Sequence, residues 1–179
     1  ITKTFDQHYV KLMASKAFRT PSIQNLAYNE DIKTEKTDVL EAELGFQLTK
    51  KNFLTANVFY QKINDPIIFN YPGGSDYING DKVATAGYEL SLKHNDDLID
   101  ANISYSFYKA LDVEAEDYET PDDSMTLGQP QHKISAYATF KLNNKIFVTP
   151  SATYHSDRWA ISSNGPKTFS KQSDSFIFN

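Results

Sequence analysis

The feature that most constrains the fold of this chain is a strict alternation of apolar and polar residues over long segments. Within the segment from Lys36 to Gln61, apolar side chains occupy every second position from Leu40 to Leu48 and from Leu54 to Tyr60, on the two sides of a short polar turn at 49–52. A period of two places the two sets on opposite faces of a β-strand. The segment therefore predicts a β-hairpin with one apolar and one polar face, and Phe59 is the one apolar residue on the polar face.

The strands of this hairpin are long for a soluble protein. Strands of soluble sandwiches usually have about 5–6 residues, whereas a strand that crosses a bilayer at a tilt needs about 9–11. The alternation from Leu40 to Leu48 and from Leu54 to Gln61, with the residues that flank it, predicts strands of about ten or more residues. These lengths favour membrane-crossing strands, with the apolar face against lipid and the carboxylates of Glu41 and Glu43 facing an aqueous interior.

The same alternation recurs along the chain. Further strand-like segments lie at 5–18, 83–93, 99–107, 134–142 and 146–154, and a strand-like fragment lies at 175–178. Pro150 interrupts one of these segments, which predicts a bulge or a kink at that position. Together with the hairpin, these segments predict about eight strands.

The connections between the predicted strands alternate between long and short. The long ones are 19–35, 65–82, 111–131 and 156–171, and the tight turns are 49–52, 94–97 and 143–145. Transmembrane barrels have short periplasmic turns and longer extracellular loops, whereas a soluble sandwich has no reason to sort its loops. The fold class that we predict is therefore all-β, an antiparallel up-and-down transmembrane β-barrel whose long loops face outward.

Composition excludes several other classes. The net charge of −5 argues against a nucleic-acid partner, and the absence of cysteine excludes disulfides and thiolate metal sites. Mean hydropathy is −0.52, and no apolar run approaches the roughly 18 residues of a membrane helix. Barrel strands escape a hydropathy test because their apolar residues alternate with polar ones.

The sequence carries no motif of catalytic chemistry. It contains no Gly-x-Ser-x-Gly elbow, no His-Glu-x-x-His pair and no glycine-rich phosphate loop. These motifs mark nucleophilic, zinc-dependent and nucleotide-dependent enzymes. We therefore predict neither an enzyme nor a protein with a cofactor.

Several segments, in order along nearly the whole chain, resemble the TonB-dependent outer-membrane receptor family. Segment 17–22 is similar to the family's Phe-Arg-x-Pro-Ser strand end, and 31–36 to its Asp-Leu-Lys-Pro-Glu-Lys segment, with Thr34 in place of the proline. Segment 41–45 resembles the family's x-x-Glu-Leu-Gly motif, and segment 58–67 resembles its Phe-Tyr-x-x-Ile-x-Asp-x-Ile motif. Segment 86–90 resembles its Gly-x-Glu-Leu motif, and segment 128–133 resembles its Pro-x-His-Lys motif.

The resemblance implies a barrel of about 22 strands with an N-terminal plug domain. Residues 1–179 would then be part of the single barrel domain, and the plug domain and the final barrel strands would lie outside this chain. Strand-like sequence at both ends agrees with a segment of a larger protein. The implied localisation is the bacterial outer membrane, and the implied partners are outer-membrane lipid, the protein's own plug domain and, through the plug, the TonB complex.

The function that the resemblance implies is active import of a scarce nutrient, bound as a small molecule at the outer face. A ferric siderophore-type chelate is the nutrient favoured by family frequency alone. Haem is disfavoured because no histidine lies between Arg19 and Lys36, where the family's haem receptors carry one. The alternatives are a passive porin-like channel, a receptor for cobalamin or another nutrient, a small closed barrel with an adhesive, structural or enzymatic role, and a soluble binding sandwich.

Two outward loops carry candidate substrate-binding residues. They are Tyr71, Asp76 and Tyr77 in one loop, and His155, Arg158 and Trp159 in the other. Aromatic rings offer stacking area, and arginine pairs with anionic groups of a ligand. For Tyr154 and Trp159 the alternative is an aromatic girdle at the membrane interface, and the role of Arg158 stays open.

The loop 111–131 is strongly acidic. Asp117, Asp122 and Asp123 are candidate calcium ligands, because clustered carboxylates can hold Ca²⁺. The spacing matches no EF-hand, so we favour a solvated surface loop. Arg19, at the outer end of its strand, is expected to pair with inward carboxylates of the neighbouring strand.

Overall fold

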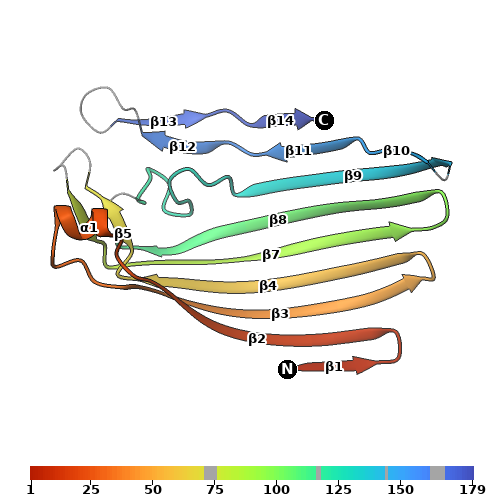
Figure 1. Cartoon of the computed structure of the whole chain (residues 1–179), viewed down its shortest axis with the longest axis horizontal. Helices are drawn as coiled ribbons and strands as arrows, with labels where there is room; N and C mark the ends of the chain where they lie inside the picture. The colour runs from red at the N-terminus through yellow and green to blue at the C-terminus, as the bar shows by residue number, and fades with distance from the viewer. Residues whose placement is uncertain (71–75, 116–117, 144, 162–167) are drawn as a thin grey trace.

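The computed structural model of the chain describes residues 1–70, 76–115, 118–143, 145–161 and 168–179. Its main element is one antiparallel sheet of ten strands (Figure 1). The strands are β1 (Thr2–Phe5), β2 (His8–Arg19), β3 (Glu35–Thr49), β4 (Asn52–Asn64), β7 (Lys82–Asn95), β8 (Ile99–Val113), β9 (His132–Asn143), β10 (Ile146–Val148), β11 (Ser151–His155) and β14 (Ser175–Phe178). We call this sheet the wall.

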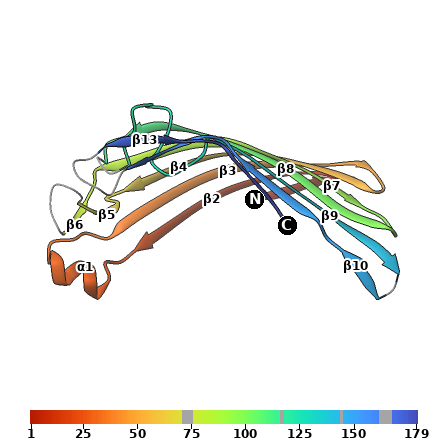
Figure 2. The same cartoon turned by 90° about the horizontal axis from the view of Figure 1, so that it is seen from above.

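Strands of the wall are ordered almost as they occur in the sequence. The order is β1-β2-β3-β4-β7-β8-β9-β11-β14, and β10 also pairs with β9. The sheet is curved rather than flat (Figure 2), and it forms an open arc with β1 and β14 as its two edges. This arrangement confirms the predicted up-and-down barrel wall.

Register in the wall confirms the two predicted faces. Leu44 pairs with Ala56 and Glu43 with Asn57, so apolar and polar rows continue from strand to strand. Apolar side chains of one face remain accessible, with exposed fractions of 38% for Leu44, 50% for Ile103 and 39% for Phe140. We call this the outer face, and we call the opposite face, which carries Glu41 and Glu43, the inner face.

Two glycines let aromatic rings lie flat on the inner face. Tyr9 is directly opposite Gly45, and Phe59 is directly opposite Gly87. A Cβ atom at Gly45 would overlap the Tyr9 ring, and one at Gly87 would overlap Phe107 O and lie 2.6 Å from Phe59 Cζ. The apolar Phe59 on a polar face therefore fills the space above Gly87.

The strand count differs from the predicted eight at two places. Segment 5–18 is not one strand, because the chain turns at Asp6, whose φ is 53°, and separates β1 from β2. The turn residues Asp6 and Gln7 include no glycine or proline, so little in the local residues marks this turn. Pro150 separates β10 from β11 as the predicted interruption.

The long connections also contain regular structure. Segment 20–34 holds the short helix α1 (Ile23–Tyr28), whose N-terminus is capped by Ser22 and Asn25. A ribbon of β5 (Ile67–Phe69) and β6 (Tyr77–Asn79) lies in the next connection, and a ribbon of β12 (Arg158–Ile161) and β13 (Phe169–Gln172) lies in the last. No helix among the described residues is long and apolar enough to cross a membrane.

The sorting of connections is confirmed. Tight turns join β3 to β4, β7 to β8 and β9 to β10 at one end of the wall, and the long connections gather at the other (Figure 1). We call these the turn end and the loop end. The described residues with buried apolar side chains all lie at the loop end. They are Ile32, Pro66, Ile67, Ile68, Val83, Ala84, Ala110, Ala115 and Met125.

Candidate functional site

The connections at the loop end are bound to one another. Asn79 accepts a hydrogen bond from Lys33 N at 2.7 Å and donates to Lys33 O at 3.1 Å and to Asp65 O at 2.8 Å. Asn29 donates to Tyr77 O at 3.0 Å. We call α1, β5, β6 and the described residues of 20–34, 65–81 and 114–131 the loop cap.

An ion pair anchors the loop cap to the wall. Arg19 lies 2.9 Å from Glu35 on the neighbouring strand, which confirms its predicted pairing. Both side chains also hold the β5 backbone, because Arg19 donates to Ile67 O at 2.7 Å and Glu35 accepts from Ile67 N at 3.0 Å. The pair therefore fixes where the β5–β6 ribbon leaves the wall.

The acidic connection folds back over the wall. Tyr108 Oη donates to Gln129 O at 3.1 Å and lies 3.2 Å from Thr126 Oγ1, and Ala110 N donates to Ser124 O at 2.9 Å. Gln131 Nε2 donates to Ser124 O at 3.0 Å. These bonds hold the returning segment against β8.

A cavity of about 450 Å³ lies between the folded-back segment and the inner face. Its lining includes Phe59, Gln61, Thr85, Glu89, Ser106, Tyr108, Gln129, Gln131 and Lys133. Ser106 donates to Glu89 at 3.2 Å. A volume of this size lies within the range of small-molecule sites, about 300–1,000 Å³.

Sequence reasoning missed this cavity. Its residues come from distant segments, and on each strand they read as ordinary inward-facing polar residues. Two signals were present in the sequence. Phe59 broke the polar pattern of its face, and the motif at 128–133 marked where the chain returns to the wall.

The first predicted binding loop is partly described. Tyr71 lies outside the described residues. The Tyr77 ring packs edge-on against Phe69, with centroids 5.2 Å apart, and against Tyr28 at 6.0 Å. Asp76 accepts hydrogen bonds from Asn70, at its backbone oxygen at 2.9 Å and at its carboxylate at 3.4 Å. Both residues thus contribute to the internal order of the loop cap.

Arg158 and Trp159, from the second predicted loop, lie on β12. Lys171 lies 5.9 Å from the centroid of the Trp159 ring and pairs with Asp157 at 2.7 Å, and this carboxylate raises the pKa of Lys171. Gly128, whose φ is +80°, donates from its N–H to Trp159 O at 2.8 Å. Within the described ranges, no hydrogen bond or ring contact joins these residues to Tyr77.

The candidate calcium ligands do not form a visible site. Asp117 lies outside the described residues. The Asp122 carboxylate accepts from the hydroxyl of Ser124 at 2.7 Å and from its N–H at 2.9 Å, and both bonds lower the pKa of Asp122. Where residues are described, no three histidine or acidic side chains group around a point that could hold a metal. Calcium binding by Asp117, Asp122 and Asp123 stays a prediction.

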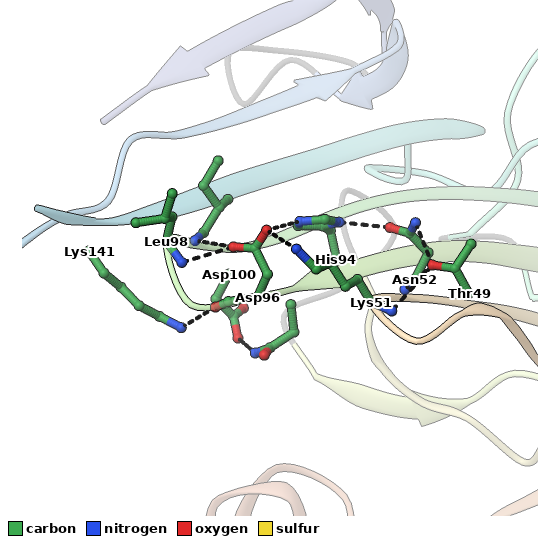
Figure 3. A network of polar contacts seen from close by, with 10 residues as sticks. Thr49, Lys51, Asn52, His94, Asp96, Leu98, Asp100 and Lys141 are labelled. Atoms are coloured by element: carbon green, nitrogen blue, oxygen red, sulfur yellow. Dashed lines mark hydrogen bonds and ion pairs between the residues drawn. The ribbon is translucent and has the colours of Figure 1, made fainter.

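A second polar network lies at the turn end (Figure 3). Asp96 accepts from Leu98 N at 2.9 Å and Ile99 N at 2.8 Å and pairs with Lys51 at 3.1 Å. The two N–H groups hold the pKa of Asp96 well below its usual range, and the bond from Lys51 adds to this effect. Because Lys51 belongs to the β3–β4 turn, the network joins two adjacent turns.

The comparisons with known proteins are consistent with this architecture. Residues 4–179 match the family model described as "TonB dependent receptor-like, beta-barrel". The chain belongs to the TonB-dependent receptor family. It is therefore a segment of a bacterial outer-membrane β-barrel, and since such barrels place their short turns in the periplasm, the loop cap faces outward.

Solved receptors share the fold of this TonB-dependent receptor segment at low sequence identity. The siderophore receptor PirA from Acinetobacter baumannii superposes with a TM-score of 0.75 and 16% identity, over 98% of this chain and 32% of that chain. The ferric-catecholate import receptor Fiu from Escherichia coli K12 superposes with a TM-score of 0.64 and 22% identity, over 96% of this chain and 25% of that chain. The ferripyoverdine receptor of the Pseudomonas aeruginosa outer membrane superposes with a TM-score of 0.69 and 15% identity, over 98% of this chain and 25% of that chain.

The chain spans about a quarter to a third of the length of these receptors. None of the curated protein sequences matches it. The matched family and the structural relatives are receptors and transporters rather than enzymes.

Proposed function

We propose that the protein imports a ferric siderophore-type chelate across the outer membrane and that TonB energises this import. The observation that carries the proposal is the cavity of about 450 Å³ beneath the loop cap. It opens on the inner face at the outward end of the wall, where a ligand arriving from outside would enter the barrel.

The lining of the cavity suits a chelate with aromatic and anionic groups. The rings of Phe59 and Tyr108 supply flat contact area. Among the described lining residues, the Lys133 ammonium is the cation and the Glu89 carboxylate is the anion, and glutamine side chains at 61, 129 and 131 offer hydrogen-bond donors and acceptors. A ligand needs both kinds of contact, because apolar area supplies affinity and a few polar groups fix orientation.

The substrate class is supported by the relatives. PirA is a siderophore receptor, Fiu is a ferric-catecholate import receptor, and the Pseudomonas receptor was solved with ferripyoverdine bound. This support is analogy between proteins of one fold. The polar inner face, with Glu41, Glu43 and Asn57, gives a plug domain a hydrogen-bonding surface, and energy would reach the receptor through that plug.

The test uses the complete receptor in its own outer membrane. A deletion strain is grown with single ferric chelates as the iron source, and uptake of the radiolabelled chelate is measured. We expect the deletion to abolish growth on at least one chelate, and we expect loss of TonB to abolish uptake. Unchanged growth on every ferric chelate would overturn the substrate class, and uptake without TonB would indicate a passive channel.

A pair of inward lysines tests the cavity itself. Lys133 lines the cavity, whereas Lys11 faces inward on β2, outside the cavity. We expect Lys133→Ala to weaken chelate binding about tenfold or more, which is the loss of one charged contact. Lys11→Ala should bind as the wild type does. Equal binding by both variants would remove the cavity from the proposal and leave the import function standing.

A further inference from the structure

Asn79 and Gly80 form an Asn-Gly pair at the end of β6, within the loop cap. Asparagine is a chemically labile residue. In an Asn-Gly pair the backbone nitrogen of the glycine can attack the side-chain amide of the asparagine, because glycine has no side chain to hinder the approach. A second pair, Asn164 and Gly165, lies outside the described residues.

Packing requires a glycine at position 80. A Cβ atom there would lie 2.6 Å from the Cβ atom of Ala115 and 3.2 Å from Cγ of Pro66. Ala115 is only 1% exposed and the Pro66 side chain is fully buried, so neither has room to move away. The close contact therefore keeps in place the residue that makes Asn79 labile.

Hydrogen bonding requires an amide at position 79. The Asn79 side chain accepts from Lys33 N through Oδ1, and its Nδ2 donates to Lys33 O and to Asp65 O. Both donor hydrogens of the amide are thus engaged. A carboxylate has no hydrogen to donate, so an aspartate at this position would place a negative charge against two carbonyl oxygens.

The closed loop cap protects the pair from reaction. Gly80 N donates to Pro66 O at 2.9 Å, so the attacking nitrogen is held by another partner. The leaving nitrogen, Asn79 Nδ2, is held by two carbonyl oxygens. The reaction therefore needs a local opening of the loop cap that breaks these bonds.

We propose that Asn79 is a site of spontaneous deamidation, which occurs while the loop cap is open and then prevents the cap from closing. Gly80 N forms a bond to Asn79 Cγ as the Cγ–Nδ2 bond breaks, and Nδ2 leaves as ammonia with the proton from Gly80 N. Water then opens the cyclic imide at either carbonyl, which gives aspartate or isoaspartate. The step uses water alone and needs no oxidant or reductant.

The first test compares the complete receptor in its native state, in detergent, with the same receptor unfolded in urea. Both are incubated at mildly alkaline pH, and peptide mass spectrometry measures the conversion of Asn79 to aspartate and isoaspartate. We expect conversion in the native state to be about a hundredfold slower or more, because opening breaks several hydrogen bonds. Equal rates in the two states, or no conversion in the unfolded chain, would overturn the proposal.

The second test loosens the loop cap. Arg19→Ala removes the ion pair that anchors the cap, and it should speed conversion of Asn79 in the native receptor about tenfold, the effect of one charged contact. The matched control is Lys16→Ala, which removes the ion pair with Asp38 between two strands of the wall. Its rate should stay within about twofold of the wild type. Equal rates in the two variants would contradict the proposal, and if Arg19→Ala does not fold, the first test decides.

The third test measures the consequence of the reaction. N79D reproduces one product, and hydrogen exchange of Lys33 N and Gly80 N should be about tenfold faster in this variant than in the wild type. N143D is the control, because the Asn143 side chain accepts from two backbone N–H groups of its own turn, and a carboxylate can do the same. Wild-type exchange of the loop cap in N79D would show that the amide does not hold it closed.

Discussion

The wall and the loop cap keep their shape by different means. In the wall, large apolar side chains such as Leu40 and Ile103 are half exposed, and strand order rests on backbone pairing. In the loop cap, Ile67 and Ile68 are only 6% exposed, and an ion pair and amide side chains hold the backbone. The difference reflects two solvents, because the wall is built to meet hydrocarbon and the loop cap is built to exclude water.

Truncating one residue in each region should give the largest contrast. Ile68→Ala leaves a cavity in the loop cap and should destabilise the cap by about 2–5 kcal/mol. Leu40→Ala on the outer face leaves no cavity because lipid fills the space, so its cost should be clearly smaller. Hydrogen exchange of the cap and unfolding of the complete receptor measure the two effects, and equal costs would contradict the comparison.

Adding a charge tests the two faces of the wall. Ile103 faces outward and Ser104 faces inward on the same strand. Ile103→Arg should cost about 2–4 kcal/mol of folding free energy in a bilayer, as arginine does near the midplane of a barrel. Ser104→Arg should cost much less. Urea unfolding in lipid vesicles measures both variants, and a costlier Ser104→Arg would reverse our assignment of the faces.

The two glycines of the wall predict an intermediate effect. Gly87→Ala places a Cβ against the backbone oxygen of Phe107, which cannot move, and should cost about 1–3 kcal/mol. At Gly45 the three atoms nearest to an added Cβ all belong to the Tyr9 ring, a side chain that can shift, so the cost of Gly45→Ala should be smaller. The fraction of receptor that folds in detergent is the measurement. If Gly45→Ala were the more harmful change, the contact with the Tyr9 ring, and not the contact with the Phe107 backbone, would limit this packing.

The smallest expected effect is one of pH at the turn end. The pKa of Asp96 is lowered in the folded protein, so its stabilising effect is complete above the ordinary aspartate value of about 4. It is lost as the pH falls below that value, because the Asp96 carboxylate is protonated at a higher pH in the unfolded state than in the folded state. Asp96→Asn should lower the melting temperature at pH 7 and flatten its decline in acid. Asp97→Asn, on the exposed neighbouring residue, should leave the pH profile as in the wild type.

The strands of the wall could be predicted from the sequence because each strand carries its own alternation of apolar and polar residues. Alternation with a period of two is written in each strand. It pairs Leu44 with Ala56, and a register shift between Gln47 and Thr49 adjusts the pairing beside the 49–52 turn. The β1–β2 turn was missed because Asp6 adopts its positive φ without the glycine that usually marks such a turn. Local signals therefore predict strands better than the places where strands end.

The candidate site could not be predicted in the same way. Tyr108 and Gln131 line one cavity because segment 118–131 folds back onto the wall, and this contact depends on tertiary structure. Arg19 was the exception, because its expected partner lay on the adjacent strand and Glu35 occupies that place. Of the predicted binding residues, Tyr77 and Asp76 are engaged within the loop cap, and their contact with a substrate stays a prediction.

The aromatic rings above Gly45 and Gly87 have a consequence for assembly. Each ring can lie flat only where its partner strand offers a residue without a side chain. If β2 slid along β3 by two residues, Tyr9 would meet Glu43 or Gln47 instead of Gly45. While neighbouring strands pair during assembly, the Tyr9–Gly45 and Phe59–Gly87 contacts would therefore favour a single register over registers shifted by two residues.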